Sequence, residues 1–395
     1  GMDGHDRWRT RVRGLPETLG EVPSAALAEE METPGAGQIR GFVTFAGNPV
    51  LSVPNGRRLA AALPSLEFMV SIDIYINETT KYADLILPPA WAMKEDYVDI
   101  FFAQMSVRNA ARWSPPVFAR DEGDYFDWEI LLKLARGLGG GPTGLAPIDR
   151  AIAIAGWLGL SWSPQLMLEF LLRTGRWGDA YLPWRRGLSL RKLRASPNGI
   201  DLGPLEPGIG HRIEHRDKRV HLEAGPVLDA WNRLNQTMKK AQTNTLVLIG
   251  RRDVRSNNSW MHNIEALARG AERCVLLVNP RDAARVGVSD GETALLESRV
   301  YRGEVRVKTT DDMALGVVSL PHGWGHSKSA PWQRVAGSRP GVSANDWTDD
   351  TVVESVVGQS VLNGVAVSLS RVTHEGDNEP IKTVTTRNND IDLLE

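Results

Sequence analysis

Two groups of residues in this sequence combine glycine with amide, hydroxyl or carboxylate side chains where an apolar segment ends. In the first group, Gly47, Asn48 and Pro49 follow one such segment, and Asp73 closes the next. A carboxylate can accept hydrogen bonds from the N1–H and the exocyclic amine of guanine together, and an amide can bond a ribose or a base edge. These residue types are compatible with a bound nucleotide, but a Gly-Asn-Pro turn taken alone is usually only a turn, and an Asp that closes a strand is usually a cap or a solvated loop residue.

The second group lies towards the C-terminus. Gly250 ends an apolar segment, and residues 256–259 (Ser-Asn-Asn-Ser) follow it. The hydroxyl, amide and backbone N–H groups of such a loop are donors suited to a pyrophosphate. Arg371 follows the final apolar segment, where a guanidinium is able to meet a phosphate.

The first group requires a sheet to position it. Apolar segments at 39–46, 66–73 and 84–88 alternate with helical spacing at 55–63 and a short polar helix at 77–82. Strand, helix, strand, helix, strand is typical of a parallel α/β sheet. Ligands of such sheets bind at the carboxyl ends of the strands, which is where Asn48 and Asp73 stand.

The second group lies among short strands. Apolar runs at 246–249, 274–278, 292–297, 302–308 and 317–320 are separated by turns rich in Gly, Asp and Pro, which favours a β-barrel. Between the two regions we expect a helix at 127–138, ended by Gly139 to Pro142, and then helices at 148–158, 164–173 and 226–234 within irregular structure. The expected fold is a parallel, Rossmann-like α/β sheet segment followed by a β-barrel.

Composition excludes several classes of protein. The net charge of −2 gives no support for a nucleic-acid or anionic-membrane partner. A single cysteine, Cys274, excludes an internal disulfide and a four-cysteine iron–sulfur cluster, and its apolar neighbours predict a buried strand residue. No signal peptide is recognisable, and the apolar stretches are too short to span a bilayer. We therefore expect a soluble, cytoplasmic protein without membrane insertion.

Taken together, these motifs resemble the dimethyl sulfoxide reductase family of molybdoenzymes. Gly47-Asn48-Pro49, Asp73 and residues 78–88 (Glu-Thr-Thr-Lys-Tyr-Ala-Asp-Leu-Ile-Leu-Pro) follow one pattern of that family. Residues 256–263, 279–283, 287–291 and 342–346 are similar to the molybdopterin-dinucleotide-binding domain, a double-psi β-barrel that closes the family's chains. The blocks occur in the family's order over roughly residues 40–372. Their co-occurrence carries the resemblance, and no single residue does.

The resemblance implies a cofactor and a set of contacts. The cofactor would be molybdopterin guanine dinucleotide with molybdenum or tungsten. Asp127 matches a position that contacts guanine, but it is equally consistent with a plain helix N-cap. Trp324 lies in a Gly-rich loop that lines the pterin pocket in the family, with simple loop packing as the alternative. The candidate cofactor-binding residues are Gly47, Asn48, Pro49, Asp73, Asp127, Gly250, Ser256, Asn257, Asn258, Ser259, His262, Trp324, Asn345 and Arg371.

The resemblance also implies that a part of the family pattern is missing. Family members usually begin with an iron–sulfur or related domain and a region that offers a ligand to the metal, and no segment here matches these. We therefore expect no iron–sulfur cluster and no metal ligand in this chain, and we assign no catalytic residue. One hypothesis is the C-terminal portion of a bis-molybdopterin-guanine-dinucleotide oxidoreductase. The alternative is a non-catalytic module, either a truncated gene product or a docking subunit.

Under both hypotheses the partner is a missing N-terminal half or a separate subunit. A chain without that half would expose apolar surface and is expected to self-associate. The expected domains are a segment left over from a truncated domain (1–38), a dinucleotide-binding α/β portion (39–141), a helical or irregular connection (142–242), the barrel (243–373) and a polar tail (374–395).

Overall fold

The computed structural model describes residues 4–99, 102–157, 162–240, 245–328 and 332–372. The predicted polar tail lies outside these residues. The chain forms two compact units: Gly1–Ile86 together with His221–Glu395, and Leu87–Val220. No helix within the described ranges is long and apolar enough to cross a membrane.

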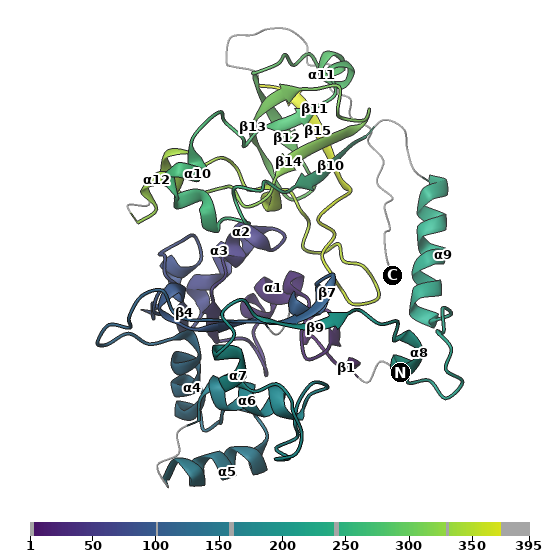
Figure 1. Cartoon of the computed structure of the whole chain (residues 1–395). Coiled ribbons are helices and arrows are strands. Elements are labelled where there is room, and N and C mark those ends of the chain that lie inside the picture. Colours follow the sequence, from purple (N-terminus) through teal and green to yellow (C-terminus); the bar gives the residue numbers. More distant parts are fainter. Residues whose placement is uncertain (1–3, 100–101, 158–161, 241–244, 329–331, 373–395) are drawn as a thin grey trace. The chain divides into compact units, whose positions relative to one another are not determined.

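The first unit contains the predicted parallel sheet. Strands β3 (Gly41–Phe45), β4 (Phe68–Ile72) and β5 (Leu85–Ile86) pair in the order β3-β4-β5, and both pairs are parallel. The central strand β4 is labelled in Figure 1. Helices α2 (Pro49–Ser52) and α3 (Gly56–Ala62) and the 3-10 turn η2 (Leu63–Ser65) connect β3 to β4. The short helix expected at 77–82 is the single 3-10 turn η3 (Thr80–Tyr82).

The N-terminal segment is part of this sheet's core. A hairpin of β1 (His5–Arg9) and β2 (Pro16–Thr18), which the charged sequence did not indicate, leads through η1 (Ser24–Ala26) into α1 (Leu27–Glu32). Met31 of α1 is completely buried and packs in one apolar cluster with Leu59, Leu63 and Met69.

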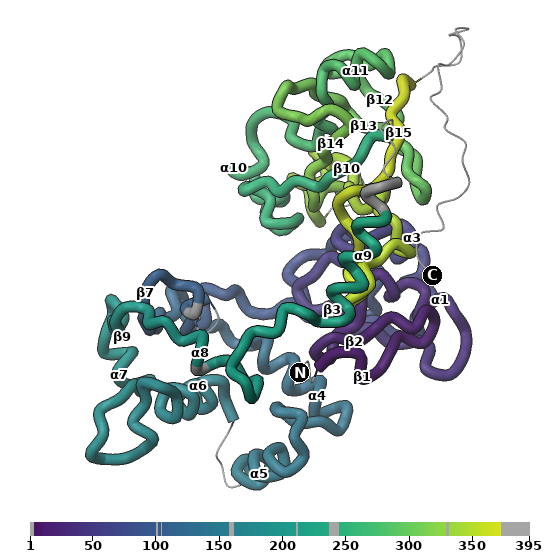
Figure 2. Tube along the Cα trace, turned by 90° about the vertical axis from the view of Figure 1, so that its right-hand side faces the viewer, coloured from purple at the N-terminus to yellow at the C-terminus, as the bar shows by residue number. Residues whose placement is uncertain are grey.

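The barrel is the other part of this unit. Its six strands are β10 (Leu246–Arg251), β11 (Leu276–Val278), β12 (Thr293–Glu297), β13 (Arg302–Thr309), β14 (Val317–Pro321) and β15 (Val365–Arg371). They close in the order β10-β14-β11-β13-β12-β15, so the predicted barrel is confirmed. Figure 2 shows β10, β12, β13, β14 and β15 gathered in one part of the trace. A second apolar cluster fills it, with Leu276, Leu296, Val318 and Trp347 fully buried. Cys274 is buried as expected but precedes β11, which begins at Leu276.

Short helices and turns decorate the barrel. They are η6 (Trp260–Asn263), α10 (Glu265–Ala268), α11 (Pro280–Val286), α12 (Arg334–Ser338) and η7 (Ala344–Asp346), and α9 (Gly225–Lys240) precedes the barrel in sequence.

The second unit is built from helices and short strand pairs. Its helical elements are η4 (Ala92–Lys94), η5 (Phe102–Met105), α4 (Asp127–Gly137), α5 (Ala146–Trp157), α6 (Pro164–Thr174), α7 (Leu190–Arg194) and α8 (Ile209–Arg212). Strand β6 (Tyr97–Val98) pairs with β8 (Trp113–Ser114), and β7 (Arg108–Ala111) pairs with β9 (Ile200–Pro204). The sequence predicted these long helices, but not the strand pairs.

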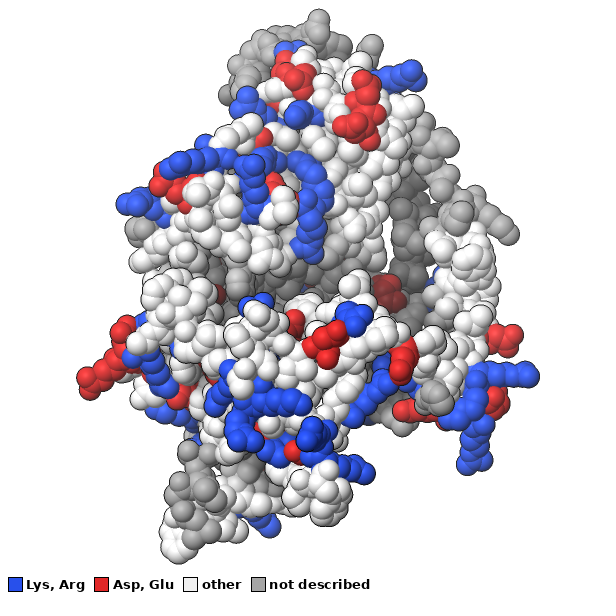
Figure 3. Space-filling view, in the orientation of Figure 1, with Lys and Arg blue, Asp and Glu red and all other residues white. Residues whose placement is uncertain are grey.

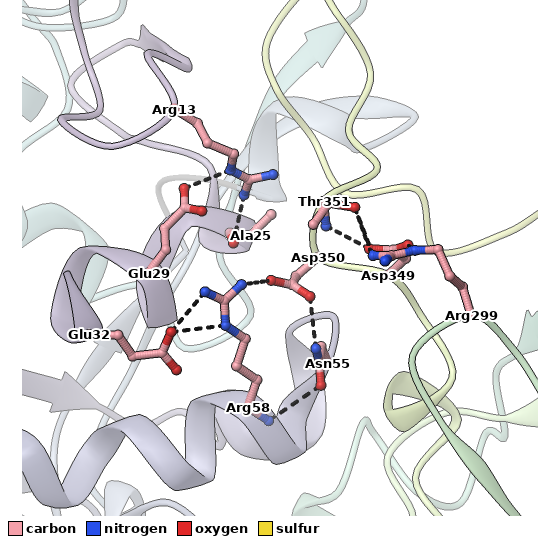
Figure 4. Close-up of polar contacts among 10 residues, drawn as sticks. All are labelled: Arg13, Ala25, Glu29, Glu32, Asn55, Arg58, Arg299, Asp349, Asp350 and Thr351. Atoms are coloured by element: carbon pink, nitrogen blue, oxygen red, sulfur yellow. Dashed lines mark hydrogen bonds and ion pairs between the residues drawn. The ribbon is translucent and has the colours of Figure 1, made fainter. Parts of the chain in front are cut away.

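Polar contacts join the sheet to the barrel inside the first unit. The Arg58 guanidinium of α3 bonds Glu32 at the end of α1 and Asp350 in the loop before β15 (Figure 4). Asn55 has a left-handed backbone (φ 49°); its Oδ1 accepts from the N–H of Arg58, and its Nδ2 donates to Asp350 at 2.8 Å. Two further arginines add bonds at the ends of this set: Arg13 to Glu29 and the Ala25 carbonyl, and Arg299 to Asp349 and Thr351.

This arrangement predicts the effect of removing Arg58. The Arg58→Ala variant is expected to lower the free energy of unfolding by about 2 kcal/mol, because the buried Asp350 carboxylate loses its cation. Denaturant unfolding followed by circular dichroism measures the change. Arg40→Ala is the matched control: Arg40 and Glu67 pair with side chains 67% and 66% exposed, and their loss should cost less than about 1 kcal/mol. Equal losses in the two variants would contradict a structural role for the Arg58 contacts.

Candidate functional site

A cleft of about 340 Å³ lies where the sheet meets the barrel in the first unit. One wall follows strand β3 and includes Gly47 and Asn48; the other comes from loops that follow β10 and β14. Part of each group that the sequence singled out therefore meets here: Gly47 and Asn48 from the first group, and residues 257–259 from the second. The residues lining the cleft are Ala46, Gly47, Asn48, Leu51, Ser52, Arg252, Asn257, Asn258, Ser259, Trp260, His322, Gly323 and Leu362.

The barrel wall presents open backbone donors. Asn257 and Asn258 both have left-handed backbones, with φ of 41° and 59°. The N–H groups of Asn257, Asn258 and Ser259 donate to no acceptor among the described residues, whereas the next three N–H groups are all bonded within the loop. Arg252 donates to the Asn258 side-chain oxygen and adds a positive charge. Successive free N–H groups beside a cation form a concavity that suits an anion.

Gly323 allows the two barrel loops to touch. Its φ is +89°, and a Cβ atom there would lie 2.1 Å from the carbonyl oxygen of Asn258. No other residue type fits this position without moving the Asn258 backbone. His322 beside it is partly buried; burial, aided by the charge of Arg252, lowers the pKa of its imidazole.

The sheet wall contributes backbone rather than side chain. Asn48 is buried, its Nδ2 donates to Glu78 at 2.8 Å, and its Oδ1 accepts from the Thr79 hydroxyl at 2.7 Å. Both ends of the amide that we expected to meet a ligand are thus bonded inside the protein. Pro49 is the first residue of α2, and Asn48 stands at the N-cap position.

Glu78 is bonded to both walls of the cleft. Its carboxylate accepts from Asn48, from His326 Nδ1 at 3.2 Å and from the N–H of Ser327 at 3.2 Å. Burial acts to raise the pKa of Glu78, but the bonds and charge of His326 and the Asn48 amide outweigh it and hold the pKa at about 2. Sequence reasoning quoted Glu78 within a motif but did not single it out, because its proximity to His326 across 248 positions leaves no local signal.

His262 and Trp324 belong to the interior behind the cleft. His262 Nδ1 lies 2.7 Å from His326 Nε2, and its ring centroid lies 4.0 Å from that of Trp324. Burial, with the nearby His326 second, lowers the pKa of His262 to about 4. His262 Nε2 and Trp324 Nε1 are buried and have no partner among the described residues.

The remaining barrel candidates are dispersed. Ser256 is buried and its hydroxyl donates to the Asp253 carbonyl, while the N–H of Gly250 donates to Asn363 Oδ1. Asn345 is buried, and its Nδ2 donates to the Leu51 carbonyl at 2.7 Å, which holds the barrel against α2. Arg371 is exposed at the end of β15, where it pairs with Ala294 of β12. None of these four candidates lines the cleft.

The two carboxylates expected at guanine also lie outside the lining. Asp73 follows β4, accepts from the Tyr75 N–H at 3.0 Å and from Asn77 Nδ2 at 3.1 Å, and burial raises its pKa. Asp127 is the first residue of α4 in the second unit, and burial raises its pKa as well. The N-cap position of α4 is Phe126, so Asp127 is not the plain N-cap considered from the sequence.

A second hollow of about 320 Å³ adjoins the same loops and shares Leu51 with the cleft. Arg57, Lys81 and Asp346 are its charged residues besides Glu78, and sequence reasoning did not identify them. Burial raises the pKa of Asp346 to about 6, against the lowering effect of Arg57.

Comparison with known proteins gives two family matches. A family model described as Molybdopterin oxidoreductase matches residues 5–136, and one described as Molydopterin dinucleotide binding domain matches residues 246–366. The first match begins at residue 5, so the likeness reaches further towards the N-terminus than the motifs between 40 and 372 indicated.

Individual relatives agree with these models. The chain is 25% identical over 331 residues to the assimilatory nitrate reductase catalytic subunit of Bacillus subtilis, covering 78% of this chain and 41% of that protein. It is 26% identical over 281 residues to the F420-dependent formate dehydrogenase subunit alpha of Methanocaldococcus jannaschii, covering 69% of this chain and 37% of that protein.

Among solved structures, acetylene hydratase from Pelobacter acetylenicus superposes with a TM-score of 0.58 at 17% identity, over 88% of this chain and 46% of that one, which supports the fold. The chain thus spans less than half the length of the curated relatives it matches. It belongs to the molybdopterin oxidoreductase family, that of dimethyl sulfoxide reductase, and it carries the family's molydopterin dinucleotide-binding domain.

Proposed function

We propose that the cleft binds the diphosphate of a molybdopterin guanine dinucleotide, so that the chain supplies part of the surface that holds a bis-pterin molybdenum or tungsten cofactor. The observation that carries the proposal is the run of N–H groups at Asn257, Asn258 and Ser259, which have no acceptor in the described chain and stand beside Arg252. Backbone donors and a guanidinium are the groups that recognise phosphate oxygens.

Charge and size support the same ligand. Lys and Arg side chains gather over the part of the barrel that bears α10 and α12 (Figure 3). Such a basic face attracts an anionic ligand even though the chain as a whole carries a net charge of −2. The 340 Å³ of the cleft is at the lower end of the range for small-molecule sites, about 300–1,000 Å³, so it suits a portion of the cofactor.

The role of the chain in this proposal is to hold and orient. The metal–pterin centre supplies the redox chemistry when it is bound, and the protein fixes its position and surroundings. Asn257, Asn258, Ser259 and Arg252 hold the diphosphate. Gly323 and the Asn48 turn shape the cleft, and Asp73 remains the candidate for the guanine edge.

The activity of the whole enzyme belongs to the same proposal: an oxidoreductase of which this chain is the dinucleotide-binding portion. Its relatives are named for nitrate and for formate, and these names assign no substrate to this chain. The partner that supplies the other half and the self-association of the chain stay predictions.

Binding of guanosine diphosphate tests the proposal directly. The chain should bind it in calorimetric titrations and bind guanosine far more weakly, because the diphosphate makes the main contacts. Arg252→Ala should weaken guanosine diphosphate about tenfold, which is ~1.4 kcal/mol. Arg255→Ala is the matched control, since Arg255 is an exposed arginine of the same loop that does not line the cleft. Equal affinity for guanosine and guanosine diphosphate, or an equal effect of both substitutions, would contradict the proposal.

Gly323→Ala tests the shape of the cleft. The added methyl group would meet the Asn258 carbonyl, displace the loop that carries the open N–H groups and reduce affinity for guanosine diphosphate by at least about tenfold. Gly270→Ala is the control: its φ of +103° carries the same backbone strain, but nothing lies within 4 Å of the new Cβ. Melting temperatures of both variants separate strain from the local clash. Unchanged affinity in Gly323→Ala would rule out this loop as the anion site.

A further inference from the structure

Glu78 is a buried acid that bonds to both walls of the cleft without lining it. From the sheet wall it accepts a hydrogen bond from Asn48 Nδ2 at 2.8 Å. From the barrel side it accepts hydrogen bonds from His326 Nδ1 and from the N–H of Ser327, each at 3.2 Å. Glu78 is 6% exposed and His326 is 5% exposed. Both side chains are thus largely shielded from water, although Glu78 also lines the second hollow.

We propose that Glu78 and His326 are positioning residues that fix the spacing of the two walls, so that affinity for the dinucleotide depends on this pair. The inference rests on the proposed function and goes beyond it, because neither side chain touches the ligand site.

The chemistry of a carboxylate makes the link directional. An ionised carboxylate accepts hydrogen bonds and donates none, so the Nδ1 atom of His326 that faces Glu78 must carry the proton. If the buried Glu78 carboxylate lost its donors on one side, its negative charge would be left uncompensated, and this is costly inside a protein. Each of the three donors is therefore held at Glu78.

The partners of Glu78 connect it to residues that line the cleft on both sides. Asn48 lines the cleft itself, and the Thr79 hydroxyl fixes the other end of its amide. On the barrel side, His322 and Gly323 line the cleft a few residues before His326. The N–H of His322 donates to the Arg251 carbonyl, and the N–H of His326 donates to the Pro340 carbonyl. The segment is thus held at both ends, and Gly323 within it packs on the Asn258 backbone. We therefore expect a shift of His326 to move the Asn258 loop.

Two substitutions at His326 separate positioning from packing. The amide nitrogen of asparagine can take the place of Nδ1 and keep the bond to Glu78, whereas that of glutamine takes the place of Nε2 and keeps only the contact with His262. We expect His326→Asn to bind guanosine diphosphate within about twofold of the unchanged chain, and His326→Gln to bind it about tenfold more weakly. If His326 acted by packing alone, asparagine, the smaller side chain, would not give the higher affinity for guanosine diphosphate.

Glu78→Gln tests the other end of the link. The amide nitrogen of glutamine would face Asn48 Nδ2, and two donors cannot bond, so the Asn48 turn should shift. We expect affinity to fall about tenfold, and the loss should not add to that of His326→Gln in the double variant, because both break one link. Glu67→Gln is the matched control, since Glu67 is an exposed acid bonded to Arg40 and lies outside the cleft.

The calorimetric titrations give distinct outcomes. Tight binding by His326→Asn, with weaker binding by His326→Gln and Glu78→Gln, supports the inference. Unchanged affinity in both weakened variants overturns it and leaves the proposed function standing, whereas a chain that binds no guanosine diphosphate overturns both. Circular dichroism identifies any variant that does not fold; if Glu78→Gln is one, the contrast between the two His326 variants decides, and equal losses in these two overturn the inference.

Discussion

The buried Glu78 carboxylate joins the sheet part of the first unit to the barrel through hydrogen bonds from both sides. The unit has two apolar clusters, one around Met31 and Leu59 in the sheet part and one inside the barrel, and these clusters are separate. The contacts described between the two parts are instead largely polar: Glu78 with His326, Asn345 with the Leu51 carbonyl, and Arg58 with Asp350. Buried polar bonds are directional, so they fix orientation where apolar packing alone allows sliding.

The cleft lies beside these polar contacts between the sheet part and the barrel. Each chain segment that borders it must either pair its backbone groups or leave them open to a ligand or to water. The Asn48 turn is bonded to Glu78, and the loop from His322 to His326 is bonded to Glu78 and to the Pro340 carbonyl. The left-handed turn at Asn257 and Asn258 keeps its N–H groups open among the described residues. The open groups therefore stand on a rigid support, which is what a site that must hold a large cofactor requires.

Several residues that resemble ligand contacts have side chains buried in the protein, although the backbone turn at Asn48 lines the cleft. Four of them are buried: Asn48, His262, Trp324 and Asn345. The side chains of Asn48, His262 and Asn345 form hydrogen bonds within the protein. A family motif therefore includes both residues that line the cleft and residues that are buried behind it. The motif alone does not separate the two, because both kinds are polar residues at the ends of strands.

The sequence by itself determined the local elements. Strand–helix alternation from 39 to 88 predicted the parallel sheet, short runs with Gly, Asp and Pro turns predicted the barrel, and the order of motifs identified the family, because all of these are set by neighbours in the chain. The β1–β2 hairpin escaped prediction because its strands lack an apolar alternation. Only the tertiary structure decided which polar residues face the cleft. The partners of Glu78 lie 30 and 248 positions away, and Gly323 meets the backbone of Asn258, so burial and distance in space, which no local pattern encodes, assigned their roles.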